Sequence, residues 1–173
     1  LPIFVYIVFF ADLILTTWVG GGYEISVYLL RILAAGQLIN LLISAPGNSI
    51  IPNLGIPKYL MYEGIISLVI NLVLSFLLIK YYGIIGAAIG TTLSTIAASS
   101  YIYFSSLRFF KQNNISFFAS IYLKPVLISF LCGIISYSAC LLIYKTGFIP
   151  AGRIGGIVLL IITSGLLLSL YII

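Results

Sequence analysis

The sequence predicts an all-α protein that crosses a lipid bilayer about six times, and three observations support this. Of its 173 residues, 62% are hydrophobic and only 6% are charged, whereas a soluble domain carries about 25% charged residues. The mean hydropathy of +1.28 is too high for a surface in contact with water. The apolar stretches are about 20 residues long and do not alternate in polarity, which favours membrane-spanning helices over the shorter strands of a barrel.

Turn-forming residues divide the chain into the predicted spans. Gly20–Gly22 ends the first span, and Pro46-Gly47 predicts a kink in the second, because proline removes a helix hydrogen bond. Pro52–Lys58 is predicted as a loop, and residues 116–124 are candidates for a stretch along the membrane interface. The spans are expected at about 2–19, 27–51, 59–79, 84–107, 125–144 and 154–173, with a polar linker at 111–114 and a loop at 145–153.

The chain opens inside an apolar run and lacks an initiator methionine, so we expect it to be the C-terminal part of a longer protein. Its basic residues stand singly at predicted span ends, which is typical of membrane anchoring and does not suggest nucleic-acid binding. The charge balance weakly places the Gly20–Ser26 turn on the outside. Lys58, Arg108, Lys111 and Lys124 fall on one side, against Lys80, Lys145 and Arg153 on the other.

Small residues recur every four positions along the fourth predicted span. This spacing places them on one helix face and predicts close approach of a neighbouring helix, since lipid-embedded helices associate through small residues. The same stripe could also form the wall of a substrate cavity, and the two interpretations are compatible. The residues are Gly86, Gly90, Ser94 and Ala98.

Few residues could support catalysis. The chain has no histidine and only three acidic residues, so we expect no metal site, no cofactor and no enzyme activity. Cys132 and Cys140 lie eight residues apart in one apolar run and cannot pair within a straight helix. They are interpreted as small apolar residues. The predicted loops are also too short and too poor in acids for a membrane glycosyltransferase or polymerase.

Polar residues inside the predicted spans are the best indicators of function. Gln37 and Asn40 are three residues apart, so they share a helix face, and Asn71 lies near the middle of the next span. Together they could line a polar cavity near the membrane centre. Hydrogen bonds between helices are the simpler alternative, and the sequence leaves both open.

Two charged residues lie nearer the outer ends of their spans. Asp12 could bind a proton or cation for ion coupling, or it could pair with a basic residue elsewhere. Arg31 could extend its side chain to the membrane interface, or it could face a cavity and hold a phosphate group. Neither residue is assigned to one role by the sequence.

One stretch is specific enough to indicate a family. It contains Pro46-Gly47-Asn48, then Gly55-Ile56-Pro57-Lys58, then the run from Asn71 to Thr91 with the pattern N-x-x-L-x-x-x-L followed by Y-G-I-I-G-A-A-I-G-T. This resembles the C-terminal half of bacterial polysaccharide flippases of the multidrug/oligosaccharidyl-lipid/polysaccharide exporter superfamily. These include the transporters of O-antigen and capsule repeat units. The last two spans match the family only in hydropathy.

The resemblance implies a two-lobed transporter of 12 to 14 helices, of which this chain would supply part of the second lobe. The implied function is translocation of an undecaprenyl-pyrophosphate-linked oligosaccharide by alternating access, in the bacterial cytoplasmic (inner) membrane. It implies that Arg31 is the in-membrane candidate for attracting the pyrophosphate. The implied partners are the substrate, membrane lipids, the remainder of the chain, polysaccharide polymerase and glycosyltransferases. A drug/cation antiporter of the same superfamily is the alternative, with Asp12 as its cavity acid.

Overall fold

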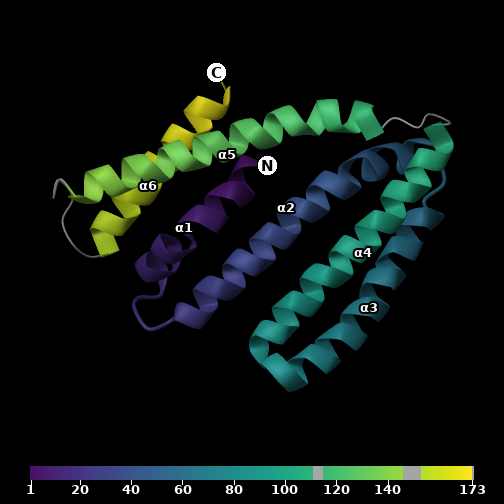
Figure 1. Cartoon of the computed structure of the whole chain (residues 1–173), viewed down its shortest axis with the longest axis horizontal. Coiled ribbons are helices and arrows are strands. Elements are labelled where there is room, and N and C mark those ends of the chain that lie inside the picture. The colour runs from purple at the N-terminus through teal and green to yellow at the C-terminus, as the bar shows by residue number, and fades with distance from the viewer. Residues whose placement is uncertain (111–114, 146–152, 173) are drawn as a thin grey trace. The chain divides into compact units, whose positions relative to one another are not determined.

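The computed structural model describes residues 1–110, 115–145 and 153–172. These residues are helical apart from short turns, which confirms the predicted all-α fold class. The predicted linker at 111–114 and most of the predicted loop at 145–153 lie outside the described residues. Within the described ranges the helices are α1 (Pro2–Trp18), α2 (Glu24–Asn53), α3 (Lys58–Tyr82), α4 (Ile84–Phe110), α5 (Ile115–Lys145) and α6 (Arg153–Ile172) (Figure 1).

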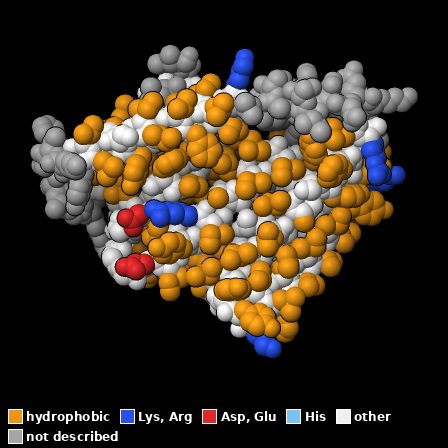
Figure 2. All heavy atoms as spheres, viewed as in Figure 1, with side chains coloured by type: hydrophobic (Ala, Val, Ile, Leu, Met, Phe, Trp, Pro, Cys, Tyr) orange, Lys and Arg blue, Asp and Glu red, His pale blue; other side chains and the backbone are white. Residues whose placement is uncertain are grey.

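Four described helices contain an apolar segment long enough to cross a membrane: Glu24–Ala45, Lys58–Tyr82, Ile84–Arg108 and Lys124–Ile143. Helix α1 and the apolar part of α6 are shorter. The 17 residues of α1 rise about 26 Å, against a hydrocarbon core about 30 Å thick. Hydrophobic side chains dominate the face drawn in Figure 2, and charged side chains occupy only a few places on it. Crossing by α1 and α6 stays a prediction.

Two helix boundaries differ from the predicted ones. Helix α2 continues through Pro46 to Asn53, so the loop predicted at Pro52–Lys58 begins only after Asn53. Helix α5 begins at Ile115, so the stretch predicted along the interface belongs to the same helix as the fifth span. Pro125 lies inside α5, where its carbonyl oxygen accepts a hydrogen bond of 2.7 Å from Ser129 Oγ. This is the usual contact of a helical serine with the carbonyl one turn before it. The carbonyl that a proline leaves without its amide partner is instead the one four residues before the proline.

The chain forms two compact units, and each is described by itself. The first unit contains residues 1–34 and 120–173, which include α1, the start of α2, most of α5 and α6. The second unit contains residues 35–119, which include the rest of α2, α3 and α4.

In the second unit, α3 and α4 form a helical hairpin with a very tight turn. Helix α3 ends at Tyr82 and α4 begins at Ile84, so one residue reverses the chain. That residue is Gly83, whose backbone φ of +58° is one that residues other than glycine rarely adopt. Its N–H donates to the carbonyl oxygen of Ile79, which closes α3.

The predicted small-residue stripe of α4 is buried along this unit. A Cβ on Gly86 would overlap the backbone carbonyl of Leu78, and a Cβ on Gly90 would lie 2.9 Å from the backbone nitrogen of Ser75. The backbones of α3 and α4 therefore touch at these two glycines. Ser94 and Ala98 are also buried. The predicted close helix contact is confirmed, and it is made with α3 at Gly86 and Gly90.

Helix α2 packs against α4 within the same unit. A Cβ on Gly36 would overlap the side chain of Thr92, and one on Gly47 would lie 3.0 Å from Cγ1 of Ile102. By contrast, α3 has no buried residue, and its exposed side chains include Leu68, Leu72 and Phe76. Such an apolar surface is suited to lipid or to another membrane helix.

In the first unit, α1 packs against α5 and α6. Tyr6 of α1 donates a hydrogen bond of 3.0 Å to the carbonyl oxygen of Leu160, and its hydroxyl lies 2.9 Å from Thr163 Oγ1. A Cβ on Gly133 of α5 would meet Val5 at 2.9 Å, and a Cβ on Gly156 of α6 would overlap Thr17. Small residues thus allow both neighbours to approach α1 closely.

Candidate functional site

The structure brings Asp12 and Arg31 to the same pocket. This pocket lies in the first unit, has a volume of about 220 Å³, and combines the two charged side chains with aromatic and aliphatic ones. Asp12 is exposed, and Arg31 is partly buried. Basic and acidic side chains also lie together near the α1–α2 turn in Figure 2. The complete lining consists of Phe9, Phe10, Asp12, Leu13, Arg31, Tyr137, Cys140, Leu141 and Leu159.

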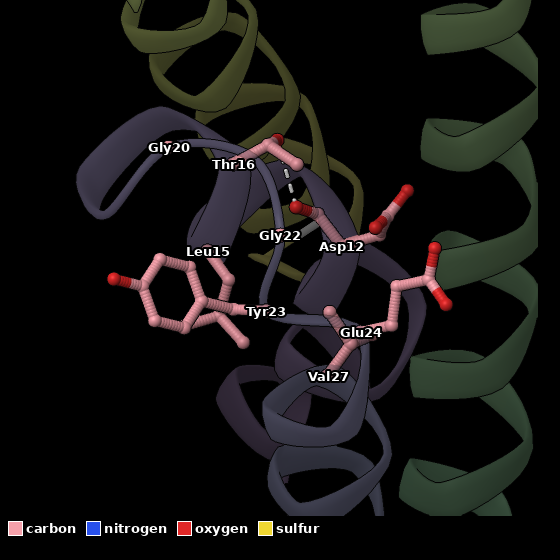
Figure 3. A pocket seen from close by; sticks show the side chains of 8 residues that line it. All are labelled: Asp12, Leu15, Thr16, Gly20, Gly22, Tyr23, Glu24 and Val27. Carbon is pink, nitrogen blue, oxygen red and sulfur yellow. Dashed lines mark hydrogen bonds between the residues drawn. The ribbon is translucent and has the colours of Figure 1, made fainter.

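Asp12 lines a second, smaller pocket of about 180 Å³ at the turn between α1 and α2. The carboxylates of Asp12 and Glu24 extend to the same side of this turn (Figure 3). The turn itself is made by glycines, and Gly22 has a φ of +95°. Thr16 stays on its own helix, where its hydroxyl donates a hydrogen bond of 2.8 Å to the carbonyl oxygen of Asp12. Asp12 therefore lines one pocket with a basic residue and another pocket with an acidic residue.

Gln37 and Asn40 share a helix face in the second unit, as the spacing predicts. Asn40 Nδ2 donates a hydrogen bond of 3.2 Å to Gln37 Oε1. On its other side, Asn40 Oδ1 accepts a hydrogen bond from Ser99 Oγ of α4. This chain of contacts joins α2 to α4 beside the close approach of Gly36 and Thr92. Hydrogen bonding between helices accounts for these polar groups, while a substrate role for Gln37 and Asn40 stays a prediction.

Asn71 makes a local contact instead. Its side-chain oxygen accepts a hydrogen bond of 2.6 Å from Ser75 Oγ, one turn further along α3. Both residues are partly buried. The described contacts therefore do not join Asn71 to Gln37 and Asn40, and its predicted place in a shared polar cavity stays a prediction.

The Asn40–Ser99 contact can be measured by a double-mutant cycle. We expect Asn40→Ala and Ser99→Ala to be coupled by about 0.6 to 1.7 kcal/mol, because the two side chains bond to each other across two helices. The measurement is the free energy of unfolding of the full-length protein in mixed micelles. As a matched control, Asn71→Ala and Ser99→Ala should be additive, because Asn71 bonds within α3. Additive effects in the Asn40–Ser99 pair would show that their contact contributes nothing.

Sequence reasoning missed Tyr137 and the position of Cys140. Tyr137 lies on α5, and its ring centroid is 6.0 Å from that of Phe9 and 5.9 Å from that of Phe10. Cys140 lies one helical turn further on, and both residues line the pocket with Arg31. A tyrosine within an apolar span, away from its ends, is the sequence signal that could have indicated Tyr137. Cys132 and Cys140 are both free thiols, as the sequence predicts.

The apolar helices define this chain as a multi-pass membrane protein. A comparison with curated proteins finds similarity to "Probable low-salt glycan biosynthesis flippase Agl15" of Haloferax volcanii. The two are 33% identical over 114 residues, which is 63% of this chain and 24% of the relative. The matched part is thus about a quarter of the relative's length. No family model matches the chain, and no solved structure matches it.

Proposed function

We propose that this chain is part of a transporter that moves a lipid-linked glycan across a membrane. The observation that carries this proposal is the similarity to a protein named as a glycan biosynthesis flippase. The apolar helices support it, because they supply the membrane-spanning framework that such transport requires. The shortage of ionisable residues also favours movement of a molecule over its chemical conversion.

The more specific proposal concerns the substrate. We propose an undecaprenyl-pyrophosphate-linked repeat unit for surface polysaccharide such as O-antigen or capsule, in the bacterial cytoplasmic membrane. Arg31 supplies a positive charge to the lining of a pocket, where it can attract the pyrophosphate group. Gln37, Asn40 and Asn71 add polar groups in the second unit. Polysaccharide polymerase and glycosyltransferases would be the partners of this pathway.

Deletion of the full-length gene, with complementation by the wild-type gene, tests the proposal. We expect the deletion strain to lose surface polysaccharide and to accumulate lipid-linked repeat units on the cytoplasmic leaflet. The measurement is the leaflet distribution of the extracted lipid-linked glycan, with surface polysaccharide quantified in parallel. Normal surface polysaccharide in the deletion strain would reject the proposal.

The alternative is a drug/cation antiporter, which needs an acidic cation site. Asp12 and Glu24 line one pocket together, which favours this reading, but Arg31 lines the neighbouring pocket with Asp12 and offsets its charge. The same deletion strain separates the two functions. An antiporter would leave surface polysaccharide intact and would raise sensitivity to cationic drugs when lost.

A further inference from the structure

We propose that the pocket lined by Asp12, Arg31 and Tyr137 binds one sugar residue of the transported glycan, an inference that rests on the proposed function. The pocket lies wholly within the first unit, where α1, the start of α2, α5 and α6 contribute its walls.

Three residues with polar side chains line this pocket. Among the residues that the structure describes, the Asp12 carboxylate, the Arg31 guanidinium and the Tyr137 hydroxyl have no hydrogen-bond or ion-pair partner. By contrast, the hydroxyl of Tyr6 on α1 bonds to Leu160 and Thr163 of α6. Asp12 and Tyr137 are exposed and Arg31 is partly buried, so their polar groups are accessible to a ligand in the pocket.

Besides polar groups, the pocket has an aromatic surface on which a sugar ring can pack. Phe10 is 2% exposed, whereas Tyr137 is 41% exposed and lies edge-on to Phe10 at an interplanar angle of 67°. The buried ring of Phe10 therefore supports the exposed ring of Tyr137. A pyranose presents C–H groups on its faces and hydroxyls around its edge. An aromatic wall with a carboxylate and a guanidinium nearby matches both kinds of surface.

Charge and size favour a neutral sugar over other ligands. One carboxylate and one guanidinium leave the lining formally neutral, which suits a polyhydroxyl ring better than a free cation. The volume of about 220 Å³ is below the range of about 300 to 1,000 Å³ typical of drug-sized ligands. Arg31 has five N–H donors, so it can donate to the sugar and to the phosphate attached to that sugar.

Binding of two lipids to the full-length protein tests the subsite. The first is the lipid-linked repeat unit extracted from the deletion strain, and the second is undecaprenyl diphosphate, which has no sugar. We expect the wild-type protein to bind the sugar-bearing lipid about tenfold more tightly. Asp12→Asn should remove most of this preference while leaving affinity for undecaprenyl diphosphate unchanged or higher, because a negative charge is lost. Isothermal titration calorimetry in detergent measures both affinities.

Glu24→Gln is the matched control. It removes one negative charge from the neighbouring pocket, but Glu24 does not line the pocket with Arg31. It should therefore keep the sugar preference.

A second pair of variants examines the aromatic wall: Tyr137→Phe keeps the ring and should retain part of the preference, whereas Tyr137→Ala should abolish it.

The outcomes distinguish the subsite from the proposed function. If the deletion strain accumulates no lipid-linked glycan, the proposed function fails before any binding is measured. If the strain accumulates it but the wild-type protein binds both lipids equally, the subsite is overturned while the function stands. Equal changes for both lipids in Asp12→Asn would also overturn the subsite, since they would reflect general electrostatics.

Discussion

Replacing Gly86 with valine should prevent the α3–α4 hairpin from forming its native contact. A Cβ at this position overlaps the backbone carbonyl of Leu78, and a backbone atom cannot rotate away as a side chain can. The helices must separate, so we expect a loss of about 3 kcal/mol or more in the free energy of unfolding. Fluorescence-detected size-exclusion chromatography of the heated full-length protein should show an aggregated or much less stable variant.

Gly64→Val is the matched control for Gly86→Val. Gly64 lies on α3, which is the partner helix, and a Cβ there meets nothing within 4 Å. The same substitution should therefore change stability by only about 0.5 kcal/mol. Equal stability of the two variants would contradict the close contact of α3 and α4.

The α3–α4 contact was open to prediction because its signal is local. Spacing of four residues places Gly86 and Gly90 on one helix face whatever the rest of the chain does, and membrane helices associate through such faces. The partner was not specified by the spacing. The partner follows from the one-residue turn at Gly83, because so short a connection brings the start of α4 directly against the end of α3.

The pocket with Asp12 and Arg31 was predictable only in part. Both residues were expected near the outer ends of their spans, and a short turn joins those ends, so their nearness follows from the order of helices. Tyr137 is more than 100 residues away in sequence and reaches the pocket only because α5 packs on α1. Hydropathy carries no information on which face of α5 meets α1, since α5 is apolar all round.

The course of α2 past Pro46 and Pro52 shows a second limit of prediction from the sequence. Pro46 was expected to kink the second span, and Pro52 was expected to begin a loop, as prolines do in soluble proteins. Within a membrane no water is available to bond the backbone groups that a helix break would free, so the backbone tends to stay helical.

Arg31→Ala should lower glycan export by about tenfold to a hundredfold, because the pocket loses its donor to the phosphate and sugar. Arg31→Lys should give an intermediate loss, since lysine keeps the charge but not the bidentate geometry. Surface polysaccharide in the complemented deletion strain measures export, with protein amount determined by immunoblot. Arg108→Ala is the matched control, because Arg108 is an exposed arginine in the last turn of α4. Normal export by Arg31→Ala at wild-type protein amount would remove Arg31 from the site.

A loss of export in Arg31→Ala could also arise indirectly, because the Asp12 carboxylate would then lack the basic side chain that lines the same pocket. These two described side chains form no ion pair, so Arg31 offsets the Asp12 charge only through the field in the pocket, and its loss makes the pocket net negative. The double variant Asp12→Asn/Arg31→Ala removes that net charge, so it should restore the amount of folded protein relative to Arg31→Ala. Export should stay low, because the guanidinium is still missing. Recovery of export in the double variant would mean that Arg31 serves only to balance Asp12.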